Sequence, residues 1–411
     1  IENIGNLPCQ CFLKFKEFVY TLADGQCVQE KGKECGKRKD MEYKINRENG
    51  ITNRGNLTRL KKLMKRAQKG ETITLGFLGG SITQGSLASQ PNLCYAYRVY
   101  SWWCKTFPQS KFVYINAGIG GTNSQFGVAR VEDDLLSSHP DFVITEFSVN
   151  DLSTEHFCET YEGVVRRICL ADGEPAVLLV HNVYYDSGSN AQVQHAKIGR
   201  HYQLPCVSMQ STIYPEILSG QIENRMITED DLHPNDLGHE LVASVITYFL
   251  EKVLAEVDQS EQPEQNFPRP LTLNTYEKSV RYQNYNCKPR MDGFISDQEP
   301  QGNITDIFKR GWYASDKGDK LKFTIEATGI SVQYRKAVNC GAPVARIVID
   351  GDESKARLLD GNFPGGWGNM LELETITEHG PLREHIVEIE IVEEAEEKKN
   401  AFYLVSLLAT K

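Results

Sequence analysis

The chain has 411 residues, which exceeds the size of one ordinary hydrophobic core, so we expect at least two domains. Hydrophobic residues make up 40% of it and charged residues 24%, as is typical of globular proteins. The net charge of −10 argues against nucleic acid or an anionic membrane as the main partner, because both carry negative charge themselves. No apolar run approaches the roughly 18–20 residues of a membrane-spanning helix.

Residues 1–44 are predicted to be an N-terminal extension that the chemistry does not need. Met41 is the first methionine, and the preceding stretch shows no sustained periodicity. It has no export signal either, because charged residues interrupt its apolar segments: Lys14, Lys16, Glu17 and Asp24. The odd count of eleven cysteines fits reduced thiols and therefore a cytoplasmic protein. Four of them fit no common zinc pattern: Cys9, Cys11, Cys27 and Cys35.

Residues 45–257 are predicted to be an α/β domain in three layers. Asn56 can cap a helix that places Leu57, Leu60 and Leu63 on one face. Helical segments follow at Tyr161–Leu170 and from Asn235 to about Val257. Short continuous apolar runs between them predict parallel strands covered on both faces: Ile73–Leu78, Phe112–Asn116, Phe142–Phe147, Ala176–Val180 and Cys206–Met209.

Residues 258–275 are polar and proline-bearing, which predicts a linker. Beyond it, residues 276–411 change to a period of two, which is typical of strands in a β-sandwich. The predicted strands are Lys320–Ala327, Ile330–Arg335, Ala345–Asp350, Met370–Ile376, Ile386–Val392 and Phe402–Leu408.

Ser81 stands where a predicted buried strand ends in Gly79 and Gly80. Ligands in open α/β sheets bind at the carboxyl ends of the strands, so a serine there is a candidate nucleophile once a base activates it. The ordinary alternative is a structural turn serine. A nucleotide-binding loop is not indicated, because no Gly-Lys-Ser/Thr sequence follows.

Asp230 and His233 are the candidate partners of that serine. Three residues apart in a turn, the carboxylate can accept a hydrogen bond from one imidazole nitrogen while the other nitrogen serves as a base. The alternative is a pair that only caps the helix after Pro234. Asp231 and Asp236 are rival carboxylates, and the spacing favours Asp230.

Gly121 and Asn150 are candidate donors to an oxyanion. Acyl transfer develops negative charge on the carbonyl oxygen, which needs hydrogen-bond donors aimed at it. A glycine lets its backbone N–H approach closely, and an asparagine amide donates without bringing charge. Both residues follow predicted strands, so they should meet the N–H of Ser81 at one sheet edge.

Together, Ser81, Gly121, Asn150 and His233 resemble the four blocks of the SGNH branch of the GDSL hydrolases. The resemblance covers about residues 50–250 and implies a flavodoxin-like α/β fold. It also implies a triad of Ser81, Asp230 and His233, an oxyanion hole of Ser81, Gly121 and Asn150, and no metal or other cofactor. Gly80 departs from the family, which usually has Asp there. Ser148 stands where the third block usually begins with glycine, which puts the local backbone geometry in question.

The opening Gly-Phe-Leu-Gly-Gly-Ser motif and the C-terminal sandwich resemble family 17 of the carbohydrate esterases, with a sandwich similar to carbohydrate-binding modules of family 35. This narrower resemblance implies a serine esterase that removes O-acetyl groups from plant oligosaccharides such as mannan or glucomannan. One alternative is a lysophospholipase or thioesterase of the same fold. Another is a non-catalytic carbohydrate-binding protein.

Trp367 is the candidate substrate-binding residue of the sandwich. It stands in the glycine-rich segment 363–369, and an aromatic ring on such a loop can stack on a sugar and cover the bound substrate. The alternative is a tryptophan that anchors the core between strands.

Overall fold

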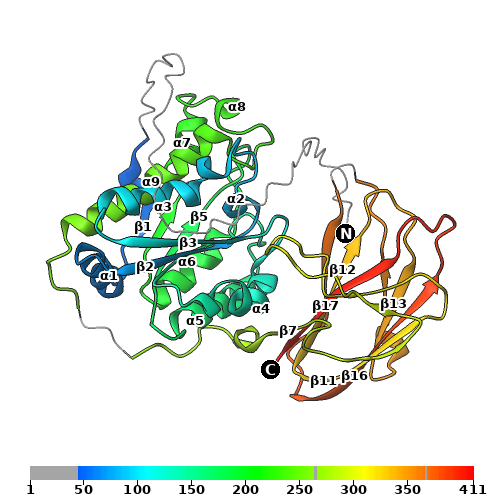
Figure 1. Ribbon diagram of the computed structural model, residues 1–411. Coiled ribbons are helices and arrows are strands. Elements are labelled where there is room, and N and C mark those ends of the chain that lie inside the picture. The colour runs from blue at the N-terminus through cyan, green and yellow to red at the C-terminus, as the bar shows by residue number, and fades with distance from the viewer. Residues whose placement is uncertain (1–44, 263–265, 366–367) are drawn as a thin grey trace. The chain divides into compact units, whose positions relative to one another are not determined.

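The computed structural model describes residues 45–262, 266–365 and 368–411. They form two compact units: residues 45–124 with 131–272, and residues 273–411 with 125–130. Figure 1 shows the helices and strands of each unit. The predicted extension over residues 1–44 lies outside the described residues.

A six-stranded sheet forms the centre of the first unit, with strands β1 (Ile51–Asn53), β2 (Thr72–Gly79), β3 (Lys111–Gly118), β4 (Phe142–Glu146), β5 (Ala176–His181) and β6 (Cys206–Ser208). Its order is β1-β6-β5-β4-β2-β3, and every neighbouring pair is parallel except β1 with β6. The chain passes from β2 to β3 on one side and then to β4 on the other. Without β1 this is the flavodoxin-like order, in which ligands bind at the carboxyl ends of the strands where the direction reverses.

The described helices of this part of the chain are α1 (Thr58–Gln68), α2 (Ser81–Gln84), α3 (Tyr95–Thr106), α4 (Ser124–Asp134), α5 (Glu155–Cys169), α6 (Gln192–His201), α7 (Ile213–Leu218), α8 (Asn224–Ile227) and α9 (Asp236–Ala255). Residues 125–130 of α4 belong to the second unit. Helices α1, α3 and α9 lie on one face of the sheet, and α5 and α6 lie on the other (Figure 1). Alternate residues of β2 (Ile73, Leu75 and Phe77) are fully buried, and they share one hydrophobic core with residues of α1, α3 and α9.

Two of the predicted helix starts lie close to the predicted residues. The N-cap of α1 is Leu57, one residue after the predicted Asn56, and Asn56 Oδ1 still accepts the Thr58 N–H at 2.9 Å. Asn235 Oδ1 accepts the N–H groups of Leu237 and Gly238 and begins α9. Only α5 differs clearly, since it starts at Glu155, six residues before the predicted start.

Two antiparallel sheets form the second unit. One contains β7 (Val280–Tyr282), β9 (Ile295–Ser296), β10 (Trp312–Ala314), β12 (Gly329–Lys336), β15 (Met370–Thr377) and β17 (Phe402–Thr410), in the order β15-β12-β17-β10-β9 with β7 also on β17. The other contains β8 (Arg290–Asp292), β11 (Lys320–Ala327), β13 (Val344–Ile349), β14 (Arg357–Asp360) and β16 (Arg383–Glu393), in the order β14-β13-β16-β11-β8.

Alternation along the strands builds the core of this unit. In β11 the side chains of Leu321, Phe323 and Ile325 are buried, while those between them face outward. They share one core with residues of the opposite sheet, such as Val332 and Leu404. The predicted fold class is therefore confirmed: a flavodoxin-like α/β domain and a C-terminal β-sandwich.

Candidate active site

Ser81 is the first residue of the short helix α2, directly after β2 has ended at Gly79. Its N–H stands at the first helical position, where no carbonyl of the same helix can accept it. The residue is 5% exposed. Its Oγ lies 2.7 Å from His233 Nε2, which is hydrogen-bond distance for proton transfer to the imidazole.

Asp230 orients the His233 ring from the other side. Asp230 Oδ2 lies 2.6 Å from His233 Nδ1, so this nitrogen is the donor when Nε2 faces the serine. The other oxygen, Oδ1, accepts the backbone N–H groups of His233 at 2.8 Å and Leu232 at 3.1 Å. The turn between α8 and α9 therefore fixes both the carboxylate and the ring.

The electrostatics of Asp230 favour its ionised form. Burial by itself would raise the pKa of this carboxyl group. Hydrogen bonds from the side chain of His233 and from the backbone N–H groups outweigh burial and lower the pKa to about 2. Asp230 is therefore a carboxylate at neutral pH and can stabilise an imidazolium that forms during attack.

The two rival carboxylates point elsewhere. Asp231 has a left-handed backbone with φ of +67°, and its carboxylate accepts hydrogen bonds from Asn224 and Arg225. Asp236 accepts the N–H and the hydroxyl of Ser89 at 2.7 and 2.6 Å. The carboxylate that the structure places on the His233 ring is thus that of Asp230.

Two predicted oxyanion donors lie in loops beside Ser81. Gly121 has φ of +68°, a conformation that favours glycine, and its N–H donates to no described residue. The neighbouring Gly120 donates its N–H to Gln84 Oε1 at 2.6 Å, which fastens this loop to α2. Asn150 lies in the turn after β4, and its side-chain amide packs directly against Gly80.

This chain is similar to known proteins. The model of the GDSL-like lipase/acylhydrolase family matches residues 77–241. Two crystal structures of a two-domain esterase active on acetylated mannans are 60% and 61% identical to this chain, with TM-scores of 0.87 and 0.88. Each match covers 90% of this chain and 99% of the other. The chain belongs to the GDSL hydrolase family.

One of these two esterase structures was co-crystallised with mannopentaose. A search among curated proteins gave no match.

The departure from the GDSL motif at position 80 has a steric reason. A Cβ atom on Gly80 would lie 2.1 Å from Asn150 Oδ1 and 2.8 Å from Asn150 Cγ, much closer than real contacts allow. Glycine therefore lets the amide of Asn150 lie against the backbone that precedes the nucleophile. An aspartate at this position would displace Asn150 from where it now packs.

The second departure, Ser148, does not disturb the turn. Its N–H and hydroxyl both donate to Glu146 Oε1, at 2.9 and 2.8 Å, and its φ is not positive. The backbone N–H of Asn150 then donates to the carbonyl of Phe147 at 3.0 Å. Where the family usually has glycine, this chain thus has a serine whose hydroxyl is hydrogen-bonded to the buried Glu146.

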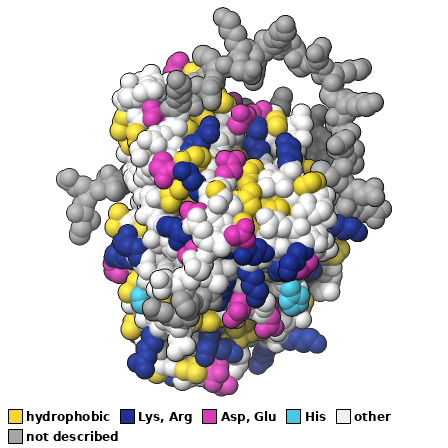
Figure 2. All heavy atoms as spheres, turned by 90° about the vertical axis from the view of Figure 1, so that its left-hand side faces the viewer, with side chains coloured by type: hydrophobic (Ala, Val, Ile, Leu, Met, Phe, Trp, Pro, Cys, Tyr) yellow, Lys and Arg dark blue, Asp and Glu magenta, His cyan; other side chains and the backbone are white. Residues whose placement is uncertain are grey.

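Trp367, the predicted substrate-binding residue, lies outside the described residues. Within the described ranges no group of three or more His, Cys, Asp or Glu side chains could hold a metal ion. None of the helices in those ranges is both long and apolar enough to cross a lipid bilayer. On the face drawn in Figure 2, Lys and Arg side chains lie among Asp and Glu side chains rather than in one basic patch.

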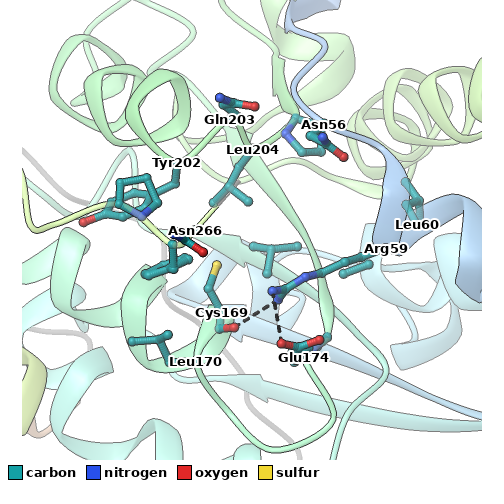
Figure 3. Close-up of a pocket in the computed structure, with 16 residues that line it drawn as sticks. Asn56, Arg59, Leu60, Cys169, Leu170, Glu174, Tyr202, Gln203, Leu204 and Asn266 are labelled. Carbon is teal, nitrogen blue, oxygen red and sulfur yellow. Dashed lines mark hydrogen bonds and ion pairs between the residues drawn. The ribbon is translucent and has the colours of Figure 1, made fainter. Parts of the chain in front are cut away.

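A cavity of about 370 Å³ lies at the opposite edge of the sheet, where β5 begins and α5 ends (Figure 3). Arg59 donates to the carbonyl of Cys169 at 3.0 Å and lies 3.8 Å from the Glu174 carboxylate. The charged side chains of Arg59 and Glu174, which line this cavity, therefore form an ion pair with each other. The Ser81 site follows the carboxyl ends of the strands, so this cavity is not the candidate active site.

Proposed function

We propose that this protein is a serine esterase that removes O-acetyl groups from acetylated mannans and the oligosaccharides derived from them. The observation that carries the proposal is the hydrogen-bonded chain from Ser81 through His233 to Asp230, with distances of 2.7 and 2.6 Å. It occurs in a chain 60% identical to a two-domain esterase active on acetylated mannans. The co-crystallisation of that esterase with mannopentaose supports an extended mannose chain as the substrate of this protein.

In the first half of the proposed reaction, Ser81 Oγ attacks the acetyl carbonyl while its proton passes to His233 Nε2. The N–H groups of Ser81 and Gly121 and the amide of Asn150 donate to the carbonyl oxygen as it gains negative charge. The bond to the sugar oxygen then breaks, and the sugar hydroxyl leaves with the proton from His233. Ser81 remains as the acetyl ester.

In the second half, water attacks the acetyl-enzyme and gives its proton to His233. The tetrahedral intermediate collapses, Ser81 Oγ regains the proton from His233, and acetic acid is released, which ionises to acetate in water. The charge of Asp230 stabilises the imidazolium in both halves. The enzyme's own protons are all returned, so the cycle needs no cofactor.

The deciding experiment measures acetate released by the purified protein from acetylated manno-oligosaccharides. Acetylated xylo-oligosaccharides, a lysophospholipid and an acyl thioester serve as competing substrates, and Ser81→Ala is the inactive control. We expect the manno-oligosaccharides to give the highest kcat/KM. A preference for the lipid or the thioester would reassign the protein to those classes of acyl hydrolase.

A non-catalytic carbohydrate-binding protein is the alternative from another class. It would bind mannan without releasing acetate from any of these esters. The intact Ser81, His233 and Asp230 chain favours the enzyme, because a binding protein gains nothing from a serine hydrogen-bonded to a base.

A further inference from the structure

A second Asp–His pair lies beneath the candidate active site. Asp151 follows Asn150 directly, and its Oδ2 lies 2.9 Å from His195 Nε2 in α6. Both side chains have no exposed surface. The His195 ring also stacks on Tyr161, with ring centroids 3.6 Å apart and planes inclined by 11°. The pair is therefore rigidly packed and cannot meet substrate.

The other oxygen of Asp151 reaches the loop that contains Gly121. Asp151 Oδ1 accepts the backbone N–H of Ser124, the first residue of α4, at 2.9 Å. Ser124 is anchored in turn, because its hydroxyl lies 2.6 Å from Thr160 Oγ1 in α5. One carboxyl group thus joins the loop after β3, the turn after β4 and helix α6.

The backbone of Asp151 closes the turn that presents Asn150. The N–H groups of Asn150 and Asp151 both donate to the carbonyl of Phe147, at 3.0 and 2.9 Å. At the start of this turn, Ser148 is bound by Glu146. Asn150 therefore stands between two buried carboxyl groups that each fix one end of the turn.

Burial determines the charge of this pair. It raises the pKa of Asp151 to about 8 and lowers the pKa of His195 to about 3. Both shifts favour the uncharged forms at neutral pH. In its uncharged form the Asp151 carboxyl can donate its proton to His195 Nε2 while it accepts the Ser124 N–H, a pattern that an asparagine amide can reproduce.

We propose that Asp151, locked by His195, is a positioning residue that holds the Asn150 and Gly121 donors in register around the oxyanion. This inference rests on the proposed function, because it assigns those two donors to an acyl-transfer reaction. It adds to the triad a second Asp–His pair, which positions the oxyanion donors Asn150 and Gly121 and does not contact the base His233.

The first test compares Asp151→Ala with Asp151→Asn. Asp151→Ala should lower kcat on a small aryl acetate by about 10²-fold with little change in KM, the scale for misplacing catalytic groups by about 1 Å. Asp151→Asn should keep most of the activity, because its amide makes both hydrogen bonds. Equal losses in the two variants would overturn the proposal.

A matched control separates positioning from ordinary destabilisation. Glu162 is another fully buried carboxyl group, in the middle of α5, and it accepts hydrogen bonds from Tyr202, Leu271 and Thr272 instead of from the loops around Ser81. Glu162→Ala should lower the Tm as Asp151→Ala does but leave kcat of the folded enzyme unchanged. If Glu162→Ala lowers kcat as much, the loss in Asp151→Ala is structural and the proposal is wrong.

Two further readouts identify the groups through which Asp151 acts. The acidic limb of the pH profile of kcat/KM should be the same in Asp151→Ala and wild type, because the triad is intact. A shifted limb would make Asp151 part of the base machinery instead. Asn150→Ala alone should cost about 10²–10³-fold in kcat, and the double variant with Asp151→Ala should lose much less than the product of the two losses.

Phosphonylation of Ser81 by a fluorophosphonate, followed by mass spectrometry, makes the result independent of the natural substrate. The phosphoryl oxygen occupies the oxyanion hole, so Asp151→Ala should slow the labelling and Asp151→Asn should not. If wild type is labelled rapidly but releases no acetate from mannan, the proposed substrate fails while this measurement still decides the role of Asp151. Equal labelling rates in all three proteins would overturn the positioning role.

Discussion

The Ser81 hydroxyl and the His233 ring act on the same proton, so removing either should stop the same step. We expect Ser81→Ala and His233→Ala each to abolish esterase activity while the fold stays intact. The double variant should lose little more, because groups that act as a unit are not additive. Turnover of aryl acetates, with circular dichroism as the folding control, checks this. Substantial residual turnover in Ser81→Ala would make another group the nucleophile.

Gly80 offers a way to displace Asn150 without changing it. Gly80→Ala introduces a Cβ that would lie 2.1 Å from Asn150 Oδ1. The amide must therefore move, and we expect kcat to fall about 10²-fold with a much smaller change in KM. Kinetics on an aryl acetate and a melting curve check this. A variant with wild-type kcat would show that the position of Asn150 is not critical.

At the residue scale, the sequence predicted what is local or belongs to a known pattern. Asp230 and His233 are three residues apart, so their pairing follows from one turn. The pairing of Asp151 with His195 joins the turn after β4 to helix α6 across 44 residues, and no spacing in the chain indicates it. The contact between Gly80 and Asn150 likewise depends on the positions of two strand ends. Such contacts follow only from the folded sheet.

At the scale of elements, long apolar runs were the most predictable. The five parallel strands were all predicted, because each contains a continuous apolar run. The edge strand β3 differs from the prediction in being partly exposed, with Val113 45% exposed. The three-residue antiparallel strand β1 was not, since it is too short to show a period. The start of α5 was missed because its first turn contains Glu155 and His156, and the apolar pattern begins later. The sandwich strands β7 to β10 and β14 were missed for the same reason as β1.

The turn between α8 and α9 should contribute stability that depends on pH. The pKa of Asp230 is lowered to about 2 in the fold from an ordinary 3.8. A lowered pKa stabilises the fold above the ordinary value, and this contribution is lost as pH falls from about 4 towards 2. The free energy of unfolding of wild type minus that of Asp230→Asn should therefore be largest above pH 5 and shrink below pH 4.

Urea unfolding between pH 3 and 6 measures that difference. Asp258→Asn, which removes a carboxylate that is 92% exposed, is the control for the loss of one charge. A difference between wild type and Asp230→Asn that stays constant over this range would show that the charge of Asp230 does not stabilise the fold.

At the scale of the whole molecule, the two units are of different kinds, and the proposed chemistry belongs to the first. Residues 45–124 and 131–272 contain all of the described residues assigned to the reaction, from Ser81 to His233. The change of period after the predicted linker was enough to predict a sandwich as the second unit. A sandwich alone indicates no function, so only the predicted α/β site distinguished an enzyme from a binding protein.

The proposed esterase should keep its full activity without any metal ion. Both ring nitrogens of His233 are engaged, Nδ1 with Asp230 and Nε2 with Ser81, so the ring is committed to proton transfer. The attacking oxygen is a serine hydroxyl activated by that base, and no metal-bound water is needed to supply a nucleophile. We therefore expect acetate release to be unchanged after prolonged treatment with EDTA and after later addition of zinc or manganese. Loss of activity with EDTA, restored by either ion and accompanied by a wild-type Tm, would assign His233 to a metal site and replace the serine mechanism.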